Sequence, residues 1–154
     1  MLKTGFVSHR FSFAFSIACF LLFTFALQPK EGLNEDVFKY TNQFRISKGL
    51  AAVVMRDDLN AIARRHSEDM ANGRCSFGHD GYNQRVLKVQ KIIKPFYGMA
   101  ENVASGARSG REVVSMWKNS SGHRKNMLGN YKFIGIGTAR NRRGVIYYTQ
   151  IFVR

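Results

Sequence analysis

The stretch WKNSSGHRKNML, residues 117–128, decides how the rest of the chain is interpreted. It places one imidazole, His123, three residues after Ser120 and directly before a basic pair. Because Ser121 and Gly122 interrupt the helical pattern, one helix is expected to end here and a short second helix to begin. His123 then lies in the first turn, where the helix dipole lowers the pKa of an imidazole and keeps it neutral. Such a histidine suits a metal ligand or a general base.

Ser120 is a candidate nucleophile only if the helix continues, because residues three apart share a helix face. We expect instead that Ser120 and Ser121 end one helix and cap the next. The sequence also contains no Gly-x-Ser-x-Gly nucleophile elbow.

Apolar residues at helical spacing predict three longer helices. Their cap and stop residues are Asn34 and Gly49 for the first, Asp57 or Asp58 and Gly73 for the second, and the Ser109 and Glu112 capping box for the third. The third helix runs from about 110 to 120 and is expected to bury Val113, Met116 and Trp117. A shorter helix at 83–90 lies inside a loop-rich middle region, 74–108.

His66 lies on the apolar stripe of the second helix, together with Leu59, Ile62 and Met70. A histidine in that position is expected to be a core residue with one hydrogen-bonded nitrogen rather than a ligand.

The C-terminal segment alternates in the manner of strands. YKFIGIGTAR (131–140), a turn at 141–144 and GVIYYTQIFVR (144–154) predict a hairpin with a central second strand, because both faces of that strand are apolar or aromatic. With an apolar run at 51–55, the order of elements predicts a sheet covered by helices.

The chain opens with a basic segment, and an uncharged apolar run follows at 11–27. This pattern is typical of an export signal, and Thr24-Phe25-Ala26 offers a cleavage site. We therefore predict a signal peptide at 1–26. The alternatives are an uncleaved membrane anchor and lipidation at Cys19.

Cleavage would leave one cysteine, Cys75, so no intramolecular disulfide could form in the mature chain. Export without disulfides indicates a bacterial envelope protein. Without Lys3 and Arg10, 22 basic and 10 acidic residues remain, a net charge of +12. This charge favours anionic envelope lipids or polymers as partners, whereas the scattered basic residues do not favour nucleic acid.

Four pieces stand in a fixed order along the chain. They are Gly78-His79-Asp80, Ala100-Glu101-Asn102-Val103, the Trp117 helix with the segment 122–128, and Tyr148-Thr149-Gln150-Ile151-Phe152. Together they resemble the CAP superfamily, or SCP-like extracellular domain, in its cysteine-poor bacterial form, over residues 33–154. The resemblance implies an α/β fold, a three-layer α/β/α sandwich with a small, mostly antiparallel sheet and an open cleft, in a protein that is usually exported.

In animal and plant members, the resemblance implies a cleft lined by two histidines and two acidic residues. His79 and Glu101 match two of these positions. Ser120 occupies the second acidic position, and Tyr147 occupies the position of the last histidine. His123 is the candidate to compensate for the missing ligands, because its Ser-x-x-His-Arg segment looks like the motif of the bacterial branch.

If His79, Glu101 and His123 converge, they form a set that could hold Zn²⁺ and leave one coordination position open. The other interpretations are that they bridge loops by hydrogen bonds, or that they take part in catalysis. Ser120 and Tyr147 are expected to border the same cleft. The leading hypothesis is an exported binding module for an envelope lipid, polymer or protein. The alternative is a metal-dependent hydrolase.

Overall fold

The structure is a computed structural model that describes residue 1 and residues 32–154. The predicted signal peptide at 1–26, with its alternatives of a membrane anchor and lipidation at Cys19, lies outside the described residues. Among the described residues, no helix has the length and apolar character needed to cross a membrane.

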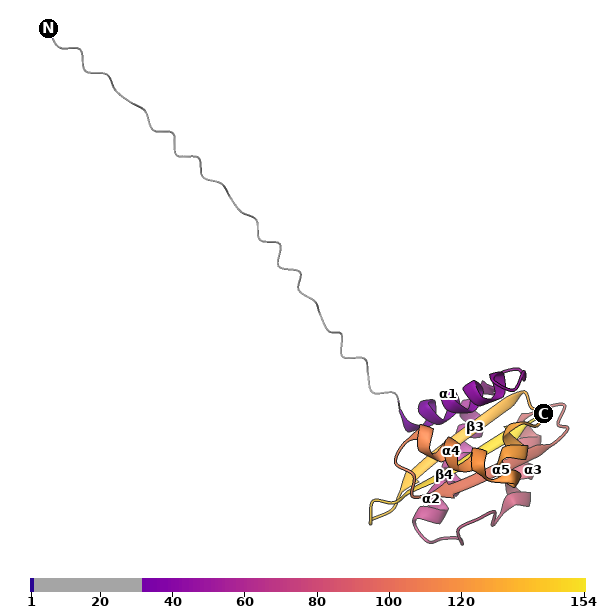
Figure 1. Cartoon of the computed structure of the whole chain (residues 1–154). Coiled ribbons are helices and arrows are strands. Elements are labelled where there is room, and N and C mark those ends of the chain that lie inside the picture. Colours follow the sequence, from indigo (N-terminus) through magenta and orange to yellow (C-terminus); the bar gives the residue numbers. More distant parts are fainter. Residues whose placement is uncertain (2–31) are drawn as a thin grey trace.

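Nine elements follow one another along the described part of the chain. They are α1 (Leu33–Ile46), β1 (Val54–Met55), α2 (Asp57–Ala71), α3 (Tyr82–Ile92), β2 (Met99–Ser105), α4 (Gly110–Asn119), α5 (Ser121–Met127), β3 (Phe133–Arg140) and β4 (Ile146–Val153). The strands form one sheet in the order β1-β3-β4-β2, in which only β1 and β3 run parallel. Helices α1, α4 and α5 cover one face and α2 and α3 the other (Figure 1). The predicted three-layer architecture is confirmed.

The C-terminal hairpin forms as predicted, with β4 between β3 and β2. Each face of β4 contributes to a separate apolar cluster: Tyr148 and Phe152 pack with Trp117, whereas Ile151 packs with Leu59. On β3, a Cβ atom at either glycine of the IGIG segment would collide with the backbone of α2. The glycines therefore allow α2 to lie directly against the sheet.

Two predicted helix caps are wrong. The N-cap residues of α1 and α2 are Gly32 and Arg56, and neither makes a side-chain cap hydrogen bond. Asn34 lies inside α1, and its Nδ2 donates to the carbonyl of Ile136 on β3 at 3.1 Å. Because β1 pairs with only two residues of β3, a side chain is needed there to cover the strand edge.

The capping box of the third predicted helix is present in part. Ser109 Oγ accepts from the backbone N–H of Glu112 at 3.2 Å, as predicted. The carboxylate of Glu112 accepts from the backbone of Arg108 at 2.8 Å. The predicted buried stripe is wrong at Met116, which is 44% exposed, while Val114 is buried in its place.

The prediction of a loop-rich middle region is wrong at Met99–Ser105, which forms β2. This strand carries Glu101 and Asn102 on its buried faces, so its sequence lacks the apolar alternation of a typical strand. The short helix predicted at 83–90 extends over Tyr82–Ile92.

Strand β2 is an edge strand, and side chains from three helices occupy its outward carbonyl groups. Tyr82 Oη donates to Met99 O at 2.7 Å, Asn126 Nδ2 to Glu101 O at 3.1 Å, and Trp117 Nε1 to Val103 O at 3.2 Å. These bonds satisfy an otherwise exposed strand edge and bring α3, α4 and α5 together around it.

Candidate functional site

A cleft of about 550 Å³ opens along the edge of β2. Its lining residues are Phe77, Gly78 and His79 from the loop before α3, Val103, Ala104 and Ser105 from β2, and Met116, Trp117, Ser120 and His123 from the α4–α5 region. The cleft therefore has mostly apolar walls and two imidazoles.

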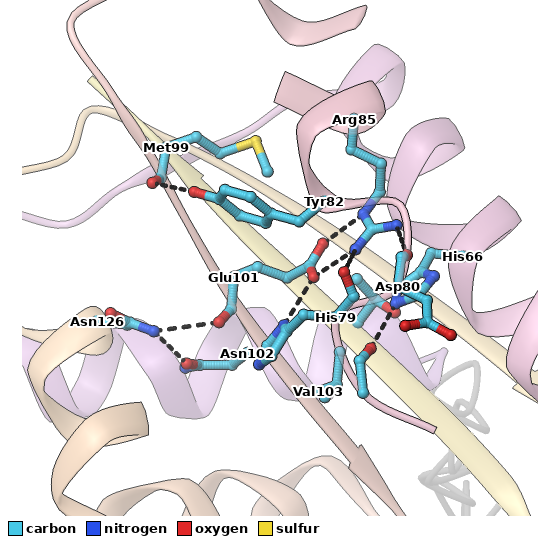
Figure 2. Close-up of polar contacts among 12 residues, drawn as sticks. His66, His79, Asp80, Tyr82, Arg85, Met99, Glu101, Asn102, Val103 and Asn126 are labelled. Carbon is cyan, nitrogen blue, oxygen red and sulfur yellow. Dashed lines mark hydrogen bonds and ion pairs between the residues drawn. The ribbon is translucent and has the colours of Figure 1, made fainter. Parts of the chain in front are cut away.

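Glu101 is not among the residues that line the cleft, and its side chain is only 1% exposed. Arg85 donates two hydrogen bonds to the carboxylate, from Nε to Oε2 and from Nη2 to Oε1, each 2.6 Å long. His79 Nδ1 lies 2.9 Å from Oε1 of the same carboxylate (Figure 2). Both oxygens of Glu101 thus accept hydrogen bonds, and the carboxylate holds Arg85 and His79 in place.

The contact with Glu101 fixes the orientation of the His79 ring. Because a carboxylate only accepts hydrogen bonds, Nδ1 of His79 carries the hydrogen and donates it. In the neutral ring, Nε2 then has a lone pair that can accept a proton or a hydrogen bond. The His79 side chain is 51% exposed, so this second nitrogen is accessible to a ligand.

The loop that carries His79 is held from two sides. Arg85 Nη1 donates to the carbonyl of Asp80 at 2.7 Å, and His66 Nε2 lies 2.8 Å from the carbonyl of Gly78. His66 is buried, as expected for a core histidine with one bonded nitrogen. Burial, the largest cause, lowers the pKa of His66, so the neutral ring is favoured.

Two asparagines connect β2 to the short helix α5. Asn102 Nδ2 donates to the carbonyl of His123 at 3.2 Å, and Asn126 Nδ2 donates to Asn102 Oδ1 at 2.9 Å. At the other end of α5, the buried guanidinium of Arg45 donates to the carbonyls of Met127 and Gly129. A seven-residue helix has little stability of its own, so these contacts determine where His123 lies.

Burial lowers the pKa of His123, and the nearby charge of His79 lowers it further. The direction of this shift agrees with the prediction from the helix terminus. The causes of the lowered pKa are different from the predicted one, because they are burial and the charge of His79 rather than the helix dipole.

Of the two further residues expected at the cleft, Ser120 lines it and Tyr147 does not. Ser120 lines the cleft at the junction of α4 and α5, but it makes no side-chain cap hydrogen bond to α5. Tyr147 is not among the residues that line the cleft. Its ring packs edge-on against Phe77, with ring centroids 6.3 Å apart, so Tyr147 reaches the cleft only through Phe77.

The candidate zinc set of His79, Glu101 and His123 is not assembled as a metal site. Within residues 1 and 32–154, no group of three or more His, Cys, Asp or Glu side chains is arranged to hold a metal ion. The carboxylate of Glu101 instead bonds to Arg85 and His79. What remains is a pair of imidazoles beside an apolar cleft.

Arg85 is a member of the site that the sequence did not predict. The sequence contains one signal for it, since Arg85 stands four residues before the buried Val89 on the same face of α3.

Asn126 connects α5 to β2 through its hydrogen bonds to Asn102 and to the carbonyl of Glu101.

The comparisons with known proteins agree with this fold. A family model described as the cysteine-rich secretory protein family, CAP, matches residues 38–152. Uncharacterized protein YkwD of Bacillus subtilis (strain 168) is 34% identical over 106 residues, which cover 67% of this chain and 41% of that protein. Uncharacterized membrane protein YlbC of the same organism is 31% identical over 122 residues, 78% of this chain and 34% of that protein. The chain thus spans less than half the length of these relatives.

Solved structures show the same arrangement of elements. An extracellular protein containing an SCP domain from Bacillus anthracis (strain Ames) has a TM-score of 0.69 at 28% identity, and the match covers 80% of this chain and 40% of that chain. An outer surface protein from Borrelia burgdorferi has a TM-score of 0.67 at 18% identity, and the match covers 77% of this chain and 89% of that chain.

Proposed function

Because the chain belongs to the CAP family, the cysteine-rich secretory protein family, we propose that it is an exported binding module whose cleft holds an apolar part of an envelope component. Export is supported by the basic and apolar N-terminal pattern, and by similarity to a protein described as extracellular. An envelope lipid is the ligand that best fits the cleft, and a polymer or a protein segment is the alternative.

One observation carries this proposal: the walls of the cleft are mostly apolar, and the ionised groups in contact with its His79 are paired with each other. Arg85 and Glu101 satisfy each other, and two large apolar side chains at the cleft, Phe77 and Met116, remain 57% and 44% exposed. Exposed apolar side chains beside a concave site favour the burial of an apolar ligand, because that burial removes their surface from water.

A hydrolase is the second candidate, and the orientation of His79 is what favours it. A carboxylate on Nδ1 and an accessible Nε2 is the arrangement of an oriented general base. Ser120 lines the same cleft, but no hydrogen bond joins its hydroxyl to an imidazole among the described residues. Because the three proposed ligands do not form a metal group, the metal-dependent form of this candidate has less support.

Trp117 offers a direct test of binding. It is the single tryptophan of the chain and lines the cleft from the core side, so a ligand that enters the cleft changes its surroundings. Titration with lysophosphatidylglycerol below its micelle concentration should give a saturable change in emission. The Phe77→Ala variant should bind about tenfold more weakly, because it loses apolar contact area. The matched control is Tyr97→Ala, since Tyr97 is 69% exposed and lies outside the cleft lining.

Equal affinities for Phe77→Ala and Tyr97→Ala would refute the cleft as the binding site. A zinc titration of the same proteins addresses the second candidate. If one Zn²⁺ per chain raised the melting temperature, and His123→Ala abolished that rise together with an ester-hydrolysing activity, the hydrolase would replace the binding module.

A further inference from the structure

A second hollow, of about 340 Å³, lies between α1 and α4. We call it the α1–α4 groove. Its lining residues are Tyr40, Gln43, Phe44 and Ser47 from α1 and its C-cap, and Arg111, Val114, Ser115 and Lys118 from α4. It shares no lining residue with the cleft, and α4 contributes to both.

The groove arises from the way the two helices meet. At the start of α4, Gly110 lies so close to α1 that a Cβ there would collide with Asp36 and the backbone of Val37. Beyond this contact the side chains of Tyr40 and Phe44 line the groove, and Phe44 is nearly buried.

Two cations stand over these two rings. The guanidinium carbon of Arg111 is 5.2 Å from the ring centroid of Tyr40, and Nζ of Lys118 is 5.1 Å from that of Phe44. Each distance is within the range of an attractive cation–π contact. The contacts hold both cations at the groove, where their N–H groups can still donate to a ligand.

Both cations lack an acidic partner in the part of the chain that the structure describes. The ion pairs there involve other basic residues, and no Asp or Glu lines the groove. Gln43 and Ser115 add neutral hydrogen-bonding groups. With a formal net charge of +14 on the whole chain, this surface is complementary to an anion.

The spacing of the cations favours a ligand with repeated charges. Arg111 and Lys118 are seven residues apart on α4, about 10 Å along the helix axis. A chain of phosphates can contact both cations along this length of helix and gain avidity over a single phosphate.

The rings under the cations argue against single-stranded nucleic acid as the ligand. Single-stranded nucleic acids bind through bases that stack on open aromatic faces. Here Phe44 is only 7% exposed, and cations occupy the faces of both rings. A polymer whose phosphates are linked by a small polyol needs no stacking surface.

We propose that the α1–α4 groove binds a linear, phosphodiester-linked polyol polymer, with successive phosphates at Arg111 and Lys118. This second site is independent of the ligand of the cleft.

The test uses isothermal titration of the purified protein with a short glycerol-phosphate oligomer at low salt. The double variant Arg111→Gln/Lys118→Gln should bind the oligomer at least about tenfold more weakly, because two charge-assisted contacts are lost. The matched control is Arg142→Gln/Arg143→Gln in the exposed turn between β3 and β4, which removes the same charge and should change the affinity less than about threefold. Glycerol 3-phosphate alone should bind the unchanged protein at least about tenfold more weakly than the oligomer.

Equal losses in the two double variants would overturn the proposal, because net charge alone would then explain binding. Tighter binding of phosphatidylglycerol vesicles or of oligothymidylate, with the same dependence on Arg111 and Lys118, would also overturn it. Either single variant, Arg111→Gln or Lys118→Gln, replaces the double variant if the latter does not fold. Phe77→Ala should leave oligomer binding unchanged, so failure here is distinguishable from failure of the cleft proposal.

Discussion

Two arginine–carboxylate pairs in this protein have nearly the same geometry and opposite surroundings. Arg85 and Glu101 form a two-bond contact with both distances at 2.6 Å, and their side chains are 8% and 1% exposed. Arg56 and Asp58 form a two-bond contact at 3.0 and 2.6 Å, with side chains 35% and 38% exposed. Water screens the exposed pair but not the buried one. Hydrogen-bond geometry alone therefore does not show how much each pair contributes to the stability of the folded protein.

The buried pair also has a role that the exposed pair lacks. Glu101 orients His79, and Arg85 holds the loop on which His79 stands. The exposed pair stands at the start of α2, where Asp58 also accepts from the backbone of Leu59. Loss of the buried pair is therefore expected to affect both stability and the cleft, whereas loss of the exposed pair should affect neither strongly.

The largest expected effect is that of Arg85→Ala. The change leaves a carboxylate without its guanidinium in a nearly dry environment, which typically destabilises a protein by about 3–5 kcal/mol. Urea unfolding followed by circular dichroism measures this loss. The His79 loop also loses a hydrogen bond, so lysophosphatidylglycerol binding should weaken in the same variant.

The control for this comparison is Arg56→Ala, which removes an arginine from the exposed pair. Exposed ion pairs contribute about 0.2–1 kcal/mol, so the midpoint of unfolding should shift little. Equal losses of stability in the two variants would show that burial does not distinguish the two pairs.

A smaller effect is expected when a neutral member of the buried network is removed. Asn102 Nδ2 donates to Gln150 Oε1 at 3.1 Å, and Asn102 Oδ1 accepts from Asn126. Asn102→Ala leaves the buried Gln150 oxygen without this donor, at a cost of about 1–3 kcal/mol. Urea unfolding again provides the measurement.

Hydrogen exchange of α5 distinguishes the positioning role of Asn102 from a general loss of stability. Amide protons of α5 should lose more protection in Asn102→Ala than those of α2, because Asn102 holds the carbonyl of His123. A uniform loss of protection over both helices would contradict this role.

The fold was largely predictable because its elements carry local signals. The C-terminal hairpin follows from alternation and a turn, and the start of α4 follows from Ser109 and its bond to Glu112. The predicted cap Asn34 failed because a tertiary contact uses its side chain, whereas Asp57 and Asp58 lie inside α2 and bond to neighbouring residues. No local pattern shows that Asn34 is needed on the edge of β3.

The site was predictable only in part, from residues that the family resemblance named. His79 and Glu101 were matched, but a charged residue on a helix, such as Arg85, normally faces solvent. Its partner Glu101 lies 16 residues away in the sequence, on a segment whose pattern predicts a loop. Tyr147 was assigned to the cleft by its matched position, but it does not line the cleft and packs against Phe77, which does.

The last expected effect is a pH dependence of stability that arises from the buried His66. Burial, partly offset by the hydrogen bond to Gly78, lowers the pKa of His66 below its unfolded value of about 6.5. Below that pH the unfolded chain binds a proton that the folded chain does not, so stability falls as the pH decreases. The slope for one such group approaches about 1.4 kcal/mol per pH unit until the folded pKa is reached.

Urea unfolding between pH 7 and pH 5 measures this slope, and His66→Gln should reduce it. The pKa of His123 is also lowered, so the double variant His66→Gln/His123→Gln should reduce it further. The exposed pair of Arg56 and Asp58 affects stability in a different pH range. The hydrogen bond from Arg56 lowers the pKa of Asp58, so the contribution of Asp58 is lost only below its ordinary pKa of about 4. If stability fell with pH as steeply in His66→Gln as in the unchanged protein, the lowered pKa of His66 would not be the cause of the acid sensitivity.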